Sequence, residues 1–217
     1  MQTIPITVSD AVASFDCMNS FVYLASQSPR RRQLLEQLGV RYELLLPHED
    51  EDAEALEVML PGELPLAYVE RVTQLKLNAA LLRLHKRGLP SAPVLCSDTT
   101  VALGRTILGK PADPSDAARM LHLLSGKTHR VLTAVALGTT VRRQQSVSIS
   151  RVTFSFMTPL QIQTYVATGE PMGKAGAYGV QGCAAAYISH ISGSYSGIMG
   201  LPMFETATLL RDFGFTT

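Results

Sequence analysis

The stretch SDTTVALGRTILGKP, residues 97–111, is the one around which we organise this chain. It follows an apolar run at residues 93–96 that is typical of a buried strand, and it places Asp98 where we expect that strand to end. A hairpin then leads to Lys110, directly before Pro111. An acid at a strand end and a lysine fixed by the next proline suit a site for a metal-bound, negatively charged ligand. The alternative is an Asp that turns the chain and a Lys that faces solvent.

Strands and helices alternate along the rest of the chain, which predicts an α/β fold. The pattern predicts further strands over residues 21–25, 41–46, 128–137, 146–156 and 184–191. It predicts helices over residues 29–38, 64–86, 114–125, 159–168 and 202–212. The two longest strands, 128–137 and 146–156, are expected to pair as a spine across two lobes.

Composition limits the class of protein. The 217 residues carry a net charge of only +1, which argues against a protein that coats nucleic acid or an anionic membrane. No apolar run is long enough to span a bilayer, and no pair of cysteines is spaced as a metal site. We therefore expect a cytoplasmic protein. We expect one domain over residues 21–217 and an N-terminal extension without fixed structure over residues 1–20, with Met18 as an alternative start.

Three arginines open the helix predicted at residues 29–38. Arg30, Arg31 and Arg32 lie in its first turn, where the helix dipole is already positive and cations are disfavoured. Helical spacing puts Arg31 on the apolar face, Arg30 at its edge and Arg32 away from it. Two inward arginines and free backbone N–H groups make a phosphate clamp. A solvated basic patch paired with Glu36 is the alternative.

Three further features have the chemistry of a nucleotide site. The acidic run at residues 48–52 could hold a divalent cation, or it is a solvated loop. Lys76 lies on the inner stripe of its helix, so it either snorkels from the core or points into a cleft. The run GKAGAYGVQG, residues 173–182, is too rich in glycine for a helix or strand and lets backbone approach a ligand, with Lys174 and Gln181 as its polar groups.

Together these groups suit a nucleoside triphosphate. Cations would hold the phosphates, carboxylates a metal, and an amide the edge of a base. The chain lacks the P-loop, the nucleophile elbow and the dinucleotide fingerprint. The pattern therefore favours a water activated by a metal and a carboxylate base.

Five collinear blocks resemble the Maf family of nucleoside triphosphate pyrophosphatases: residues 24–40, 97–111, 117–137, 169–182 and 193–206. The resemblance implies a mixed sheet with long central strands flanked by helices, and two lobes around a nucleotide cleft. It implies hydrolysis between the α and β phosphates with a divalent metal, Mg²⁺, Mn²⁺ or Co²⁺. It further implies a homodimer that removes unwanted nucleotides and uses neither nucleic acid polymers nor membranes as partners.

The resemblance also assigns residues. Asp98 matches the catalytic base and Glu51 is the match to the loop acid near the metal, although the alignment through the acidic run is loose. The other matching site positions are Ser26, Arg30, Arg31, Lys76, Lys110 and Gln181, and those tied to substrate choice are Arg30, Thr99 and Gln181.

The form KAGAYGVQG resembles the branch that acts on dTTP and UTP. Gly173 departs from that branch, which usually has Asp there. Two alternatives stay open: a non-catalytic nucleotide-binding regulator of division, and the same reaction on a different base.

Overall fold

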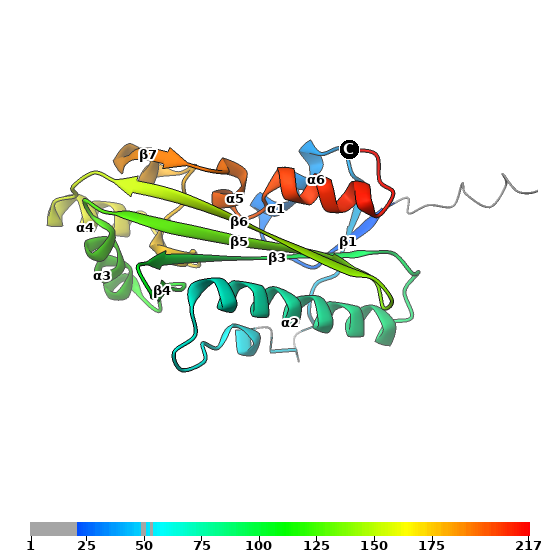
Figure 1. The fold of residues 1–217 in the computed structure, drawn as a ribbon. Coiled ribbons are helices and arrows are strands. Elements are labelled where there is room, and N and C mark those ends of the chain that lie inside the picture. The colour runs from blue at the N-terminus through cyan, green and yellow to red at the C-terminus, as the bar shows by residue number, and fades with distance from the viewer. Residues whose placement is uncertain (1–20, 49–50, 53) are drawn as a thin grey trace, which may run out of the picture.

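The computed structural model describes residues 21–48, 51–52 and 54–217, and in that part of the chain seven strands form one sheet flanked by six α-helices (Figure 1). The sheet order is β2-β1-β3-β5-β6-β7, and β4 pairs with β3. The strands β1 (Val22–Leu24), β2 (Tyr42–Leu44) and the start of β3 (Val94–Leu103) are parallel. All other pairings are antiparallel. The mixed α/β sheet expected from the family resemblance is confirmed. The extension at residues 1–20 lies outside the described residues.

The predicted spine is present. Strands β5 (Thr128–Gly138) and β6 (Arg143–Phe154) pair antiparallel over their whole length, from Thr128 opposite Thr153 to Gly138 opposite Arg143. Together with β3 they run the length of the molecule (Figure 1). Their many Val, Thr and Ile residues suit extended backbone because branched side chains pack well on a pleated surface.

Helices cover the sheet on both faces. Helix α2 (Pro65–Lys86) lies along one face, while α1 (Pro29–Gln37) and α6 (Met203–Asp212) lie on the other (Figure 1). The alternation of β1 shows why: Val22 and Leu24 pack with the α1 and α6 core, and Tyr23 packs with the α2 core. Helices α3 (Pro114–Leu124) and α4 (Pro159–Ala167) enclose a third core at the far end of the long strands.

Side chains cap the first turns of α3 and α4. Asp113 accepts a hydrogen bond from Asp116 N at the start of α3. Thr158 and Gln161 form a reciprocal capping box on α4. Ser28 occupies the N-cap of α1 with extended backbone, but its side chain makes no capping bond. The first turn of α1 therefore keeps unsatisfied N–H groups.

Several expected boundaries are wrong. The strand expected to end before Asp98 continues to Leu103, because β5 pairs with it as far as Ala102. The strand expected over residues 184–191 is a 3-10 turn, η3 (Cys183–Tyr187), followed by β7 (Ile188–Ser192). A short helix that was not expected, α5 (Tyr195–Met199), follows β7 and is capped by Ser194. The strand expected over residues 146–156 begins and ends earlier.

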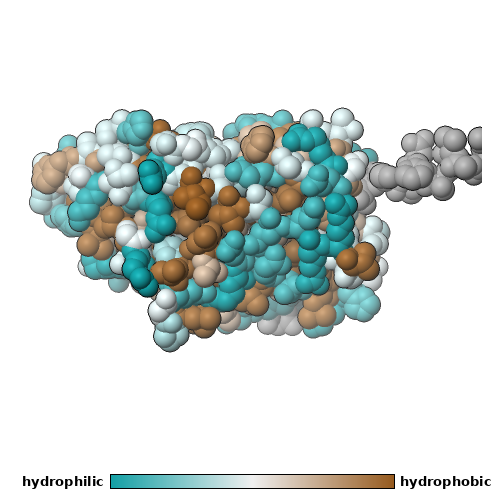
Figure 2. Space-filling view, viewed as in Figure 1, coloured by the Kyte–Doolittle hydropathy of each residue, from teal (hydrophilic) through white to brown (hydrophobic). Residues whose placement is uncertain are grey.

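The described part of the chain contains no helix of the length and apolarity that a membrane crossing needs. The face shown in Figure 2 carries mainly hydrophilic side chains on its right half, and its hydrophobic side chains gather left of centre.

Candidate functional site

A cleft of about 470 Å³ opens beyond the carboxyl end of β1 and beside the middle of β3. In the sheet, β2 lies on one side of β1 and β3 on the other. The connections that leave β1 and β2 therefore run in opposite directions, and a crevice forms where they separate. Its volume lies in the range of small-molecule sites. The cleft is lined by the segment after β1, the middle of β3, the hairpin to Lys110 and the glycine-rich loop.

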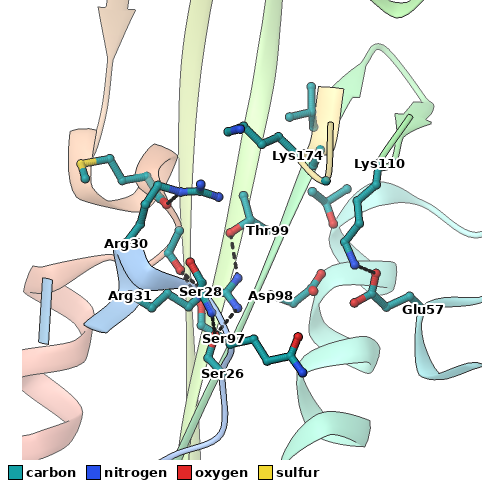
Figure 3. Close-up of a pocket in the computed structure, with 18 of the residues that line it drawn as sticks. Ser26, Ser28, Arg30, Arg31, Glu57, Ser97, Asp98, Thr99, Lys110 and Lys174 are labelled. Carbon is teal, nitrogen blue, oxygen red and sulfur yellow. Dashed lines mark hydrogen bonds and ion pairs between the residues drawn. The ribbon is translucent and has the colours of Figure 1, made fainter. Parts of the chain in front are cut away.

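Arg30 and Arg31, the two arginines expected to face inward, are held by the backbone around Gly200. Arg31 Nε donates to Gly200 O at 2.7 Å, and its Nη atoms lie 3.2 Å from Ser26 Oγ and 3.5 Å from Thr99 Oγ1. Arg30 Nε donates to Met199 O at 3.3 Å. Both arginines line the cleft and Arg32 does not, as helical spacing predicted (Figure 3).

Among the described residues, no carboxylate lies at ion-pair distance from the Arg31 guanidinium. Its hydrogen-bond partners are a carbonyl and two hydroxyls. Burial lowers the pKa of the Arg31 guanidinium, and the nearby Asp98 carboxylate opposes that shift. A desolvated, unpaired cation in a cleft is a favourable place for an anion.

A second group of charges is centred on Asp98, which is buried in the middle of β3. Lys76 Nζ lies 2.6 Å from Asp98 Oδ1 and 2.8 Å from Glu57 Oε1. Glu57 Oε2 in turn accepts from Lys110 Nζ at 2.9 Å. Figure 3 shows Asp98 between the arginines on one side and the Glu57–Lys110 pair on the other. Lys76 therefore points into the cleft, which decides between the two readings of its position.

Strand β3 also places Thr99, whose hydroxyl is turned toward the arginine clamp. Thr133 Oγ1 on β5 lies 3.1 Å from Thr99 Oγ1 and donates to Gly197 O at 2.7 Å. Ser97 Oγ lies 3.0 Å from Gly200 O, the same carbonyl that Arg31 binds. The turn after α5 is thus joined to the clamp and to the central strands.

The glycine-rich loop forms the remaining wall. Lys174 and Gln181 both line the cleft, and the Lys174 amine faces the Arg30 guanidinium (Figure 3). Burial lowers the pKa of Lys174, and the charge of Arg30 lowers it further. Gly176 approaches Val101 so closely that an added Cβ would lie 2.8 Å from Val101 Cγ1. The contact at Gly176 is with a core side chain, and the close approach of backbone to a ligand that the sequence predicted for these glycines stays a prediction.

Glu51 is the expected site residue that the structure places elsewhere. Its carboxylate is held by Arg83, with Nη2 at 2.7 Å and Nε at 2.9 Å from Oε2, and it does not line the cleft. The Arg83 hydrogen bonds hold the pKa of Glu51 at about 2. The structure therefore does not bring Glu51 and Asp98 together, although both were expected near a metal.

Glu57 is the site residue that sequence reasoning missed. It ends the 3-10 turn η1 (Glu54–Glu57), where its carbonyl accepts from Tyr68 OH at 2.9 Å. Burial acts to raise the pKa of Glu57, but Lys76 and Lys110 hold it below its ordinary value. No sequence pattern marks Glu57 as a site residue, because its position in the cleft depends on where α2 lies.

No group of three or more His, Cys, Asp or Glu within the described residues could hold a metal by itself. The two cleft carboxylates, Asp98 and Glu57, nevertheless converge on one cationic group, Lys76 Nζ. Mg²⁺ in proteins is commonly bound by one or two carboxylates together with phosphate oxygens of the substrate. The residues present fit a divalent ion that the substrate helps to hold.

Comparison with protein families matches residues 21–213 to Maf, described as a Maf-like protein. The dTTP/UTP pyrophosphatase of Albidiferax ferrireducens is 74% identical over 198 residues, 91% of this chain and 99% of that protein. The dTTP/UTP pyrophosphatase of Polaromonas sp. is 70% identical over 89% of this chain and 96% of its own. A third, from Cupriavidus pinatubonensis, is 64% identical over 89% and 97%.

Proposed function

The chain belongs to the Maf family, and on that premise we propose that it is a nucleoside triphosphate pyrophosphatase acting on dTTP and UTP. The reaction gives the monophosphate and pyrophosphate. Relatives that carry this activity in their names are 64–74% identical over nearly their whole length. The cleft supports the proposal with several cations that can bind phosphates and with two carboxylates, Asp98 and Glu57, placed among them.

The observation that carries the proposal is the state of Asp98. Lys76 holds Oδ1, while Oδ2 has no hydrogen-bond partner among the described residues. In the proposed step a water attacks the α-phosphorus, Oδ2 accepts its proton, and the bond from the α-phosphorus to the bridging oxygen breaks. Lys110 and the arginine clamp offset charge on the leaving pyrophosphate. Positioning and electrostatics then supply most of the rate enhancement.

We also propose a divalent cation, Mg²⁺, Mn²⁺ or Co²⁺, held by Asp98 and Glu57 together with phosphate oxygens. When bound it would neutralise negative charge on those oxygens. Glu57 takes the place that Glu51 was expected to fill. Lys76 lies between the two carboxylates and keeps them close before a nucleotide arrives.

An assay of pyrophosphate release from dTTP, UTP, CTP, GTP and ITP, with and without Mg²⁺, tests the function. We expect dTTP and UTP to be cleaved fastest. Asp98→Asn should lower turnover about 100-fold or more while UTP binding stays near wild type. Asp116→Asn, on the exposed side of α3, is the matched control. Wild-type pyrophosphate release by the Asp98→Asn protein would refute the role of Asp98.

The same panel separates the alternatives. A non-catalytic regulator of division would bind nucleotides and release no pyrophosphate, and an enzyme of different base preference would cleave another member of the panel faster. We further propose a cytoplasmic homodimer that clears unwanted, including modified, pyrimidine nucleotides. Light scattering of the purified protein checks the dimer.

A further inference from the structure

The carboxylate of Glu170 connects the two ends of the glycine-rich loop that lines the cleft. The loop follows α4 and ends at η3, so Glu170 stands near its beginning and Cys183 at its end. Glu170 Oε2 accepts from Cys183 N at 2.8 Å, and Oε1 accepts from Tyr165 OH of α4 at 2.8 Å. The Lys174 amine donates to the Glu170 carbonyl. One residue thus joins the two ends of the loop, its middle and the preceding helix.

The position of this carboxylate explains why residue 182 is glycine. Gly182 has φ −102°, which any residue adopts, so its backbone conformation does not call for glycine. An added Cβ, however, would lie 2.2 Å from Glu170 Oε1 and 2.5 Å from Oε2. Only glycine admits the carboxylate at that position. Gly182 directly follows Gln181, so the packing of Glu170 fixes the backbone next to that cleft residue.

The middle of the loop is held by burial of Ala177, Tyr178 and Val180 in the core that α3 and α4 enclose. Its two ends are joined by Glu170. Residues 169–183 include five glycines, and each ordered residue costs about 1–2 kcal/mol of backbone entropy, most for glycine. Hydrogen bonds to a carboxylate are about twice as strong as neutral ones. Burial acts to raise the pKa of Glu170, but the hydrogen bonds from Cys183 and Tyr165 hold it below its ordinary value. The ionised form is the one that the loop binds.

We propose that Glu170 is a positioning residue for nucleotide selection, which fixes the loop so that Gln181 and Lys174 meet the nucleoside part of the substrate. This inference rests on the proposed function. The triphosphate is held separately by Arg31 and Lys110, which belong to α1 and the β4 hairpin rather than to the loop. Loss of Glu170 should therefore weaken recognition of the nucleoside and spare recognition of the phosphates.

The test compares Glu170→Ala and Tyr165→Phe with matched controls. Tyr42 OH donates to Glu36 Oε1 at 2.7 Å on the exposed side of α1, so Glu36→Ala and Tyr42→Phe remove the same kind of pair away from the cleft. Each protein is assayed for kcat and KM with dTTP, UTP and CTP. Calorimetry gives the binding of UTP, CTP and inorganic tripolyphosphate, a probe of the phosphate clamp alone.

For Glu170→Ala we expect KM for UTP to rise about 10-fold or more and the preference for UTP over CTP to fall by a similar factor. Tripolyphosphate binding should stay within about 2-fold of wild type. Tyr165→Phe, which keeps the bond to Cys183, should change in the same direction by less. Both controls should match wild type.

An unchanged UTP to CTP preference in Glu170→Ala would overturn the inference, and so would a parallel loss of tripolyphosphate binding. If that variant fails to fold, Glu170→Gln is measured by the same criteria, because its single carbonyl oxygen can serve only one of the two donors. A wild-type protein that binds UTP and releases no pyrophosphate would overturn the proposed function instead. The binding constants of the variants would then decide the role of Glu170.

Discussion

Acidification should destabilise this protein through one buried imidazole, that of His129. The ring lies in β5 with 2% of its surface exposed and packs edge-on against Phe154 and Tyr178 at 5.4 Å. Its Nε2 lies 2.8 Å from Tyr178 OH, and its buried Nδ1 has no hydrogen-bond partner within residues 21–48, 51–52 and 54–217. Burial lowers the pKa of His129 to about 4 from the ordinary 6.5.

The sign and size of the effect follow from linkage. Between pH 6.5 and pH 4 the unfolded chain binds a proton at this position and the folded chain does not, so stability falls as pH falls. At about 1.36 kcal/mol per unit the contribution reaches about 3 kcal/mol by pH 4. Between pH 7 and pH 5 it is about 2 kcal/mol.

Urea denaturation of wild type and His129→Phe at pH 7 and pH 5 measures this contribution. Phenylalanine keeps the aromatic packing and removes the titration, and the loss of the Tyr178 partner lowers stability equally at both pH values. We expect wild type to lose about 2 kcal/mol more than His129→Phe over this range. His122→Gln, on the surface of α3, should behave as wild type. Equal pH dependence in wild type and His129→Phe would refute the reasoning.

Two further predictions concern the cleft walls. Gly176 has φ +69° and Val101 against it, so Gly176→Ala should lower the free energy of unfolding by about 2–4 kcal/mol in urea, whereas Gly173→Ala, at φ +70° with open space, should lose only about 1 kcal/mol. Similar losses for both would contradict the packing argument. Arg31→Met should cost less than about 1 kcal/mol without ligand, because an unpaired, partly buried charge is removed, and should abolish the rise in Tm with UTP. Retention of that rise would show that Arg31 does not hold the nucleotide.

Helix bounds and the direction in which the arginines face could be predicted from the sequence, because they depend on residues close by in the chain. The caps at Asp113 and Thr158 bond within one turn of their own helices. The facing of Arg31 follows from helical spacing to the apolar residues of its own helix. The long strands were found because their composition persists for ten or more residues. The family resemblance extended these readings to a fold and a reaction.

The positions of the acidic side chains could not be predicted from the sequence, because they depend on segments far away in the chain. Asp98 lies inside a strand rather than at its end, because β5, some 35 residues later, continues to pair with β3. Glu57 rather than Glu51 faces the cleft, because α2 presents Lys76 to one acid and Arg83 to the other. The two acids lie six residues apart, and nothing in their local sequence shows which of them turns toward the cleft.

The sequence by itself determined most of the elements, the inward facing of Arg30 and Arg31 and the family, since helix and strand periodicity and collinear motifs are properties of the chain. Only the tertiary structure decided which carboxylates share Lys76 and which one closes the glycine-rich loop. The physical reason is distance. A carboxylate accepts hydrogen bonds only from donors within about 3 Å of its oxygens, and folding alone brings such partners together.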